Sequence, residues 1–123
     1  MSQDPLRRKA EVPESDIQVT LADAFSKLSP EKLFETVFER PDEISVELYA
    51  PRGVDRQTPH ERDEIYIVAT GTGTFSRGRE LVSFGPGDLL YVPAHVPHRF
   101  ETFSDDFKVW VIFYGPKRPG PSI

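Results

Sequence analysis

Short apolar stretches separated by glycine and proline are the feature that most limits how this chain can fold. From residue 33 to residue 114, β-branched and aromatic residues alternate with polar ones, and each stretch ends at turn-forming residues. Eight stretches follow this pattern: 33–40, 44–50, 65–70, 74–77, 81–84, 89–92, 99–103 and 107–114. Turn signals at this frequency predict an all-β fold of antiparallel strands, in a sandwich or a barrel.

One short helix is predicted before these strands. Apolar residues at positions 21, 24, 25 and 28 have helical spacing, Thr20 is a suitable N-cap, and Pro30 ends the segment. A chain of 123 residues fits a single domain. We therefore expect a flexible polar arm at 1–20, a short helix and linker at 21–32, a barrel at 33–116 and a C-terminal tail at 117–123.

Composition excludes several classes of function. Fifteen basic against twenty acidic residues give a net charge of −5, the wrong sign for binding to nucleic-acid phosphates. No apolar run approaches the length of a membrane span or forms a signal segment, so we expect a cytoplasmic protein without membrane association. The chain has no cysteine, which excludes zinc-thiolate sites and cysteine nucleophiles. Any metal site would have to use histidine and carboxylate.

Two segments carry polar residues at a spacing that suits such a site. They are PHERDEIYIVATG and GPGDLLYVPAHVPH. The spacing is carried by His60, Glu64 and Gly71 in the first segment and by Gly87, Pro93 and His98 in the second. Together the segments resemble the two conserved motifs of the cupin superfamily. The first of those motifs reads Gly-x5-His-x-His-x3–4-Glu-x6-Gly, and the second reads Gly-x5-Pro-x-Gly-x2-His-x3-Asn.

The match departs from these motifs at four positions. Thr58 stands where the first histidine is expected, His95 replaces the second motif's glycine, and Thr102 replaces its asparagine. Gly53 lies one residue away from the position of the opening glycine. The resemblance implies an antiparallel jelly-roll β-barrel with a metal inside. Carried over by position, it implies three metal ligands, which are His60, Glu64 and His98.

Reasoning from the residues supports the same ligands. Side chains alternate across a strand, so positions 58, 60, 64 and 66 can share one face if the bend between them preserves that alternation. Two imidazoles and one carboxylate are also the facial set that leaves open positions on Fe(II). Gln57 has the opposite parity to His60 but can become a fourth ligand if its loop bulges. The resemblance further implies that Thr58, at the first ligand position, points at the metal, where its neutral hydroxyl would leave a position open.

Further residues are candidates for contact with a substrate. Tyr66 could orient a substrate, and Arg62 could lie at the mouth of the site and bind an anionic group, although a surface turn is the simpler interpretation of Arg62. His95, between two prolines, is expected at the surface or the rim. The aromatic residues Tyr66, Tyr91, Phe100 and Trp110 either line an apolar pocket or pack in the core.

These observations favour a metal-dependent cupin enzyme acting on a small molecule, with a dioxygenase-type oxidoreductase as the leading hypothesis. The metal would be a divalent transition ion such as Fe, Mn, Ni or Zn. The same residues would also suit an isomerase or lyase, or a non-catalytic cupin that binds a sugar or organic acid. A homodimer is expected as well, because Ile17 and Val19 in the arm alternate with polar residues and could add a strand to a second copy.

Overall fold

Two antiparallel sheets and one short helix make up the computed structural model, which describes residues 17–120. Most of the predicted arm, residues 1–16, and the end of the predicted tail, residues 121–123, lie outside the described residues. The elements are α1 (Leu21–Phe25), β1 (Phe34–Arg40), β2 (Ile44–Tyr49), β3 (Asp63–Thr70), β4 (Gly73–Arg77), β5 (Glu80–Phe84), β6 (Leu89–Val92), β7 (His98–Phe103) and β8 (Lys108–Tyr114). No helix within 17–120 is long and apolar enough to cross a membrane.

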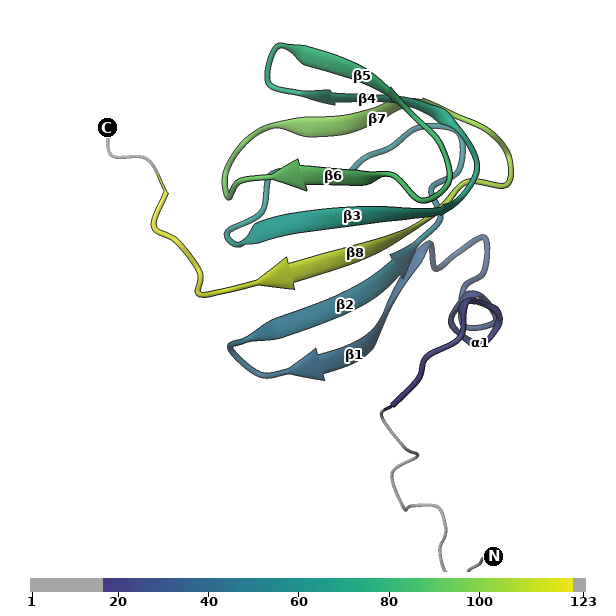
Figure 1. Ribbon diagram of the computed structural model, residues 1–123, viewed down its shortest axis with the longest axis horizontal. Helices are drawn as coiled ribbons and strands as arrows, with labels where there is room; N and C mark the ends of the chain where they lie inside the picture. The colour runs from purple at the N-terminus through teal and green to yellow at the C-terminus, as the bar shows by residue number, and fades with distance from the viewer. Residues whose placement is uncertain (1–16, 121–123) are drawn as a thin grey trace, which may run out of the picture.

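The strand order shows how the chain passes between the two sheets. The larger sheet has the order β1-β2-β8-β3-β6 and the smaller one has the order β5-β4-β7, so sequence neighbours such as β3 and β4 lie in different sheets (Figure 1). All described pairings are antiparallel. This confirms the predicted all-β jelly-roll fold. The two sheets face each other but are not joined by strand pairing into one closed cylinder.

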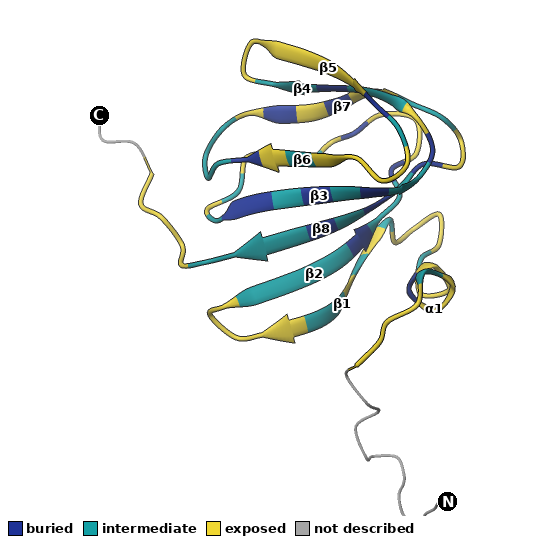
Figure 2. Cartoon of the chain, viewed as in Figure 1, coloured by how far each residue is buried: buried dark blue, intermediate teal, exposed yellow. Residues whose placement is uncertain are grey.

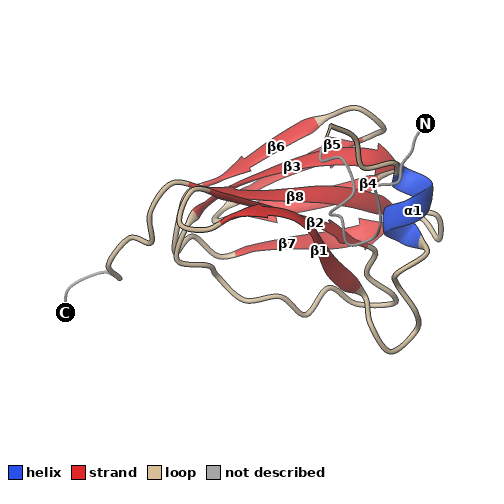
Figure 3. Cartoon of the chain, turned by 90° about the horizontal axis from the view of Figure 1, so that it is seen from below, coloured by secondary structure: helices blue, strands red, loops and turns tan. Residues whose placement is uncertain are grey.

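The predicted elements are confirmed with small shifts in their ends. Each of the eight strands begins and ends within two residues of its predicted bounds. The hydroxyl oxygen of Thr20 accepts a hydrogen bond from the Asp23 N–H, so Thr20 caps α1 as predicted. The helix ends at Phe25, earlier than the apolar spacing indicated, and lies at one end of the sheets (Figure 3).

Aromatic side chains fill the space between the sheets. The ring of Phe100 on β7 lies 4.9 Å from Tyr66, 4.8 Å from Phe75 and 4.8 Å from Phe107, measured between centroids. Edge-to-face and tilted pairs of this kind are stabilising beyond the area that they bury. Buried positions lie along β3, β7 and β8, whereas β5 and α1 are largely exposed (Figure 2). Tyr66 and Phe100 are therefore core residues, while Tyr91 is 42% exposed.

Backbone packing around Gly73 ties the end of β4 to the end of β7. A Cβ atom at this position would collide with the Thr102 carbonyl oxygen and would lie 2.9 Å from the Phe103 Cα. Both atoms belong to the backbone of β7, so neither can move without disturbing the ladder between β4 and β7. Only glycine fits at this position.

We therefore expect Gly73→Ala to lower the free energy of unfolding by about 1 to 3 kcal/mol, the usual cost of overpacking. Urea unfolding followed by fluorescence would measure this loss. Gly85→Ala is the matched control, because the nearest atom to its Cβ is the Thr72 Cγ2 at 4.0 Å. Equal stability of the two variants would contradict this account of the packing.

Candidate metal centre

Three potential metal ligands converge between the two sheets from separate parts of the chain. His60 lies in the loop that leads into β3, Glu64 is the second residue of β3, and His98 is the first residue of β7. Glu64 faces the interior because it belongs to the alternating inward set of β3 that includes Tyr66 and Val68, all of them buried. The structure thus brings together the three residues that the sequence predicted.

The distances between the ligand atoms suit a single cation. Glu64 Oε1 lies 3.3 Å from His98 Nε2 and 4.0 Å from His60 Nε2, and one ligand atom from each residue lies within 4.8 Å of the others. Ligands bound to one ion at about 2.1 Å are separated by roughly 3 to 4 Å. The side chains of Glu64 and His98 are buried, whereas that of His60 is 32% exposed.

The hydrogen bonding of His98 fixes which nitrogen faces the site. Its Nδ1 lies 2.8 Å from the Val96 carbonyl oxygen, which can only accept, so Nδ1 carries the proton. Nε2 is then left with a free lone pair directed at Glu64, as a metal-bound imidazole requires. Burial lowers the pKa of both His60 and His98, which favours the neutral ring that binds a metal.

The buried carboxylate of Glu64 lacks a partner among the described residues. Neither of its oxygens accepts a hydrogen bond, and His98 Nε2 is also unpaired. Burial raises the pKa of Glu64 to about 7, because the charged form is poorly solvated there. Unpaired buried polar groups are costly, and a divalent cation would satisfy all three atoms at once. The residues present therefore fit a metal ion.

Gln57 places a fourth oxygen at the edge of this set. Its amide oxygen lies 3.5 Å from His60 Nε2 and accepts a hydrogen bond from the Tyr66 hydroxyl at 3.0 Å. Its amide nitrogen donates to Asp55 Oδ2 at 2.8 Å, and this bond fixes the orientation of the amide. The oxygen, rather than the nitrogen, thus faces His60, which suits a metal ligand.

Asp55 is the buried group on which this arrangement depends. Its carboxylate accepts four hydrogen bonds: from the Tyr49 hydroxyl at 2.5 Å, the Phe100 N–H at 2.9 Å, the Gln57 N–H at 3.2 Å and the Gln57 side chain at 2.8 Å. Tyr49 is on β2 and Phe100 is on β7, so a single carboxylate links both sheets to the loop before His60. Charge-assisted bonds of this kind are stronger than neutral ones.

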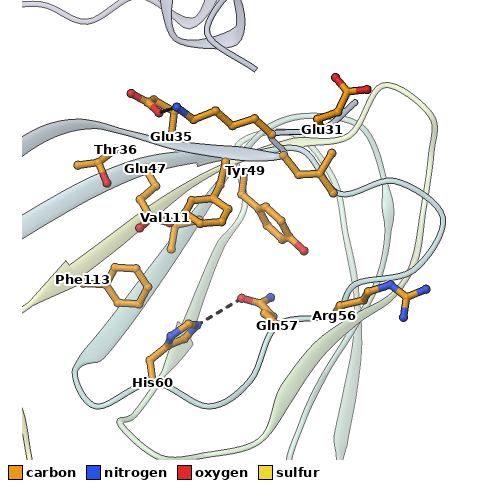
Figure 4. A pocket seen from close by; sticks show the side chains of 13 residues that line it. Glu31, Glu35, Thr36, Glu47, Tyr49, Arg56, Gln57, His60, Val111 and Phe113 are labelled. Carbon is orange, nitrogen blue, oxygen red and sulfur yellow. Dashed lines mark hydrogen bonds and ion pairs between the residues drawn. The ribbon is translucent and has the colours of Figure 1, made fainter. Parts of the chain in front are cut away.

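A cavity of about 680 Å³ opens beside these residues. His60 and Gln57 line one side of it, and Glu47, Val111 and Phe113 line the sheet side, as Figure 4 shows. The Phe113 ring meets the His60 ring edge-on at 4.9 Å. Glu47 is half-buried, and burial raises the pKa of its carboxyl group. The volume is within the range of sites that bind small organic molecules.

Comparison with known proteins places the chain in a family. Residues 45–114, more than half of the chain, match the family model described as the cupin domain. The chain belongs to the cupin family.

Three relatives illustrate the range of this likeness. An uncharacterized protein of Streptomyces coelicolor is 39% identical over 82 residues, which cover 65% of this chain and 78% of that protein. Acireductone dioxygenase of Bacillus pumilus is 39% identical over 59 residues, which cover 44% of this chain and only 33% of that enzyme. The crystal structure of a cupin-2 domain containing protein from Shewanella frigidimarina aligns with a TM-score of 0.62 at 20% identity and covers 78% of this chain and 93% of that chain.

The departures from the cupin motif are partly explained by the structure. Thr58 is exposed, so the expectation that it points at the metal is wrong, and Gln57 lies beside His60 instead. The physical reason is that residues 50–62 form no strand, so side-chain alternation does not extend back from β3. His95, in the motif's glycine position, has a φ of 68°, which preserves the left-handed backbone that glycine normally provides.

The two predicted substrate contacts occupy other positions. Tyr66 is completely buried behind Gln57 and does not line the cavity. Arg62 donates from Nε to the Gly115 carbonyl oxygen at 2.9 Å and lines a smaller hollow next to His60, together with Phe113. Their roles toward a substrate stay predictions, and the same is true of metal ligation by Gln57.

The C-terminal tail holds the two ligand loops together. Arg118 donates from Nη2 to Asp63 Oδ2 at 2.7 Å, its N–H donates to the Glu61 carbonyl oxygen, and its own carbonyl accepts from His95 Nε2 at 2.8 Å. The His95 N–H donates in turn to the His60 carbonyl oxygen at 2.7 Å. Arg118 therefore connects the loop that carries His60 to the loop that precedes His98.

Sequence reasoning missed four residues of this site. Asp55 looks solvated in a polar loop, and Arg118 lies in a tail without any motif. Tyr49 and Glu47 belong to a predicted strand, in which they alternate with the apolar residues of β2. This alternation indicates that the two side chains lie on the same face of the strand. No pattern in one sequence indicates which of the two faces is inside.

Gln57→Leu should weaken metal binding about tenfold, the lower end of losses seen when a group supporting a metal site is removed. Thr58→Val, the adjacent exposed residue, should leave metal affinity unchanged. Competition with a fluorescent chelator would measure both affinities, and urea unfolding would show whether either variant is destabilised. Loss of affinity in Thr58→Val with none in Gln57→Leu would reverse the assignment of the two positions.

Arg118→Met should weaken metal binding about three- to tenfold, because the tail loses its side-chain bonds to Asp63 and is held to the two loops only by its backbone bonds to Glu61 and His95. A small effect is expected because the guanidinium is half exposed. Lys117→Met removes the same charge from the neighbouring residue, whose ion pair with Glu61 is exposed, and should have no effect. Isothermal titration with a divalent metal would compare the two, and equal affinities would refute the anchoring role.

Proposed function

We propose that this cupin is a metal-dependent enzyme of the dioxygenase-type oxidoreductase class that acts on a small molecule, with a divalent transition metal held by His60, Glu64 and His98. The observation that carries the proposal is a buried, unpaired carboxylate beside two neutral imidazoles at the wall of a cavity. Two histidines and one carboxylate leave several coordination positions open.

When bound, such a metal would bind a chelating substrate, lower its pKa and activate dioxygen. The protein's own residues shape the cavity in which a substrate would bind. His60 is the ligand that faces the cavity, and the Phe113 ring packs against it. Val111 and Phe113 form an apolar wall of the cavity next to His60.

Glu47 supplies a titratable group on the side of the cavity opposite His60. Its carboxyl lines the cavity on β2, and its raised pKa keeps a proton on it more readily than on an exposed glutamate. A group of this kind can take a proton from a substrate hydroxyl or return one. Tyr49 and Gln57 are already engaged with Asp55, so they fix the shape of the cavity.

Support for the dioxygenase class comes from one of the relatives. Acireductone dioxygenase of Bacillus pumilus shares 39% identity with this chain over 59 residues, and the match covers one third of that enzyme. Glu47 also favours a second candidate, a metal-dependent isomerase or lyase. Both of those reactions need a group that transfers a proton to or from the substrate, and neither needs dioxygen.

Metal analysis followed by dioxygen uptake would separate these classes. Purified protein would be reconstituted with Fe(II), Mn(II), Ni(II) or Zn(II) and assayed with a panel of enediols, catechols, thiols and hydroxy acids. Dioxygen consumption with the iron form would support the proposal. Conversion of a panel compound without dioxygen would support the isomerase or lyase. Failure to bind any of the four metals would overturn both.

His98→Ala should reduce metal affinity at least about a hundredfold and abolish turnover, because one of three ligands is lost. His95→Asn is the matched control, because its side chain contacts the Arg118 carbonyl and asparagine tolerates the left-handed backbone. The control loses one contact between the tail and the loop before His98, so its metal affinity should fall no more than the three- to tenfold expected for Arg118→Met. Equilibrium dialysis with metal analysis would measure both, and equal retention would show that the site is wrongly placed.

A further inference from the structure

A second, smaller hollow of about 310 Å³ adjoins His60. It lies at the end of the larger sheet where β8 runs into the tail (Figure 1). His60 and Phe113 line both this hollow and the larger cavity, so the two spaces are neighbours. We call it the Arg62 hollow, and its walls are formed by Pro59, His60, Glu61, Arg62, Phe113 and Lys117.

Arg62 places a charge in this hollow for which the described residues provide no counter-ion. A guanidinium stays charged at every physiological pH. The Arg62 Nε donates to the Gly115 carbonyl oxygen at 2.9 Å, whereas Nη2 is buried without a hydrogen-bond partner. No carboxylate within residues 17–120 forms an ion pair with this half-buried group. Burial of a charge without a partner is costly, and the protein alone leaves this cost uncompensated.

Two other arginines of the described chain show the usual arrangement. Arg77, which is also half-buried, donates to the Glu80 carboxylate at 2.6 Å, and Arg118 donates to Asp63 at 2.7 Å. Arg62 differs from both because its hydrogen bond goes to a neutral carbonyl oxygen. An arginine of this kind is expected where an anionic ligand supplies the missing partner.

The surrounding backbone fixes the Arg62 guanidinium in place. The carbonyl that accepts from Nε belongs to Gly115, which has a φ of 73° and whose N–H donates to the Glu43 carbonyl oxygen at 3.0 Å. The next residue after Arg62 is also anchored, because the Asp63 carboxylate accepts a hydrogen bond from the Ala94 N–H at 3.0 Å. A ligand that meets a fixed partner loses less free energy to ordering.

The outer edge of the guanidinium is free to bind such a ligand. The Arg62 Nη1 makes no hydrogen bond within residues 17–120, and it is not among the buried atoms that lack a partner. Lys117 adds a second cation to the wall, and its ammonium lies 3.6 Å from the Glu61 carboxylate with both side chains exposed. Exposed ion pairs are weak, so Lys117 can also contact an anion in the hollow.

A further hollow on another side of Arg62 is less suited to an anion. It is lined by Glu39 and Asp42 as well as by Arg62 and Lys117. Neither of these carboxylates forms an ion pair with Arg62, and both would repel a second negative charge. An anionic ligand is therefore expected in the Arg62 hollow, where the one acidic residue already faces Lys117.

We propose that the Arg62 hollow binds a small organic acid, whose carboxylate pairs with Arg62 and Lys117 and whose apolar body packs against Pro59 and Phe113. The planar fork of a guanidinium matches a carboxylate group. A volume of about 310 Å³ is at the lower end of the range for ligand sites and suits a molecule the size of benzoate. None of these contacts requires the metal, so this proposal is independent of the proposed function.

Titration of the isotope-labelled full chain with sodium benzoate, followed by NMR, tests the proposal. The ionic strength would be held constant with sodium chloride, because salt screens charges of this kind. A ligand of this size is expected to bind with a Kd on the order of 1 mM. The amide signals of Arg62, Gly115 and Lys117 should shift and reach saturation. The absence of any saturable shift in the wild type would overturn the proposal.

Arg62→Gln should weaken benzoate binding at least about tenfold, because a charge-assisted pair is lost. Arg99→Gln is the matched control for net charge and should bind like the wild type. Arg99 lies between the buried His98 and Phe100 on β7, so its side chain points away from the interior on the other sheet. Lys117→Gln changes an exposed side chain, should weaken binding about two- to threefold, and serves as the second variant if Arg62→Gln does not fold. Equal Kd values in the wild type and in both hollow variants would overturn the proposal.

Two further titrations test the location of the site and the class of its ligand. Protein freed of metal by chelation and dialysis should bind benzoate with the same Kd as protein loaded with Zn(II). Binding that requires the metal would place benzoate on the metal centre and overturn the proposal. Acetate lacks the apolar body and should bind more weakly than benzoate. Tighter binding of acetate or of inorganic phosphate would contradict the assignment to an organic acid that packs against Pro59 and Phe113.

Discussion

The four hydrogen bonds to Asp55 are the interaction on which the site depends. A carboxylate that is 1% exposed is stable only if its charge is fully compensated, and the Tyr49 hydroxyl, the Phe100 N–H and two groups of Gln57 supply this compensation. These donors belong to β2, to β7 and to the loop before β3. The Asp55 carboxylate therefore determines both how the two sheets are held relative to each other and which way the Gln57 amide is turned.

Much of the fold was predictable because the local signals agree. Glycine and proline mark nearly every strand end, the stretches between them have the composition of strands, and Thr20 caps the only helix in the described part of the chain. The three residues of the candidate metal centre were predictable for a different reason. His60 and Glu64 lie on either side of the start of β3, and His98 begins a strand of the facing sheet, so their spacing in sequence follows from the geometry of the fold.

The remaining features depend on contacts between distant residues. The alternation of side chains along a strand could not predict where Gln57 points, because residues 50–62 form no strand. The hydrogen bond to Asp55 sets the orientation of the Gln57 side chain instead. The direction of Glu47 depends on which face of β2 is turned toward the cavity, and no local pattern contains that information. Arg118 acts through Asp63, which is 55 residues away along the chain. A single sequence gives no indication of such a contact.

The contact between the tail and the ligand loops has a consequence for the energetics of both. If docking of residues 115–120 favours the arrangement of the His60 and His98 loops, then occupation of the centre must favour docking of the tail by the same free energy, since linkage is reciprocal. The peptide N–H of Arg118, which donates to the Glu61 carbonyl oxygen, would then exchange its hydrogen more slowly when the centre is loaded. An amide five residues from the end of the chain thereby becomes an internal reporter of events inside the barrel.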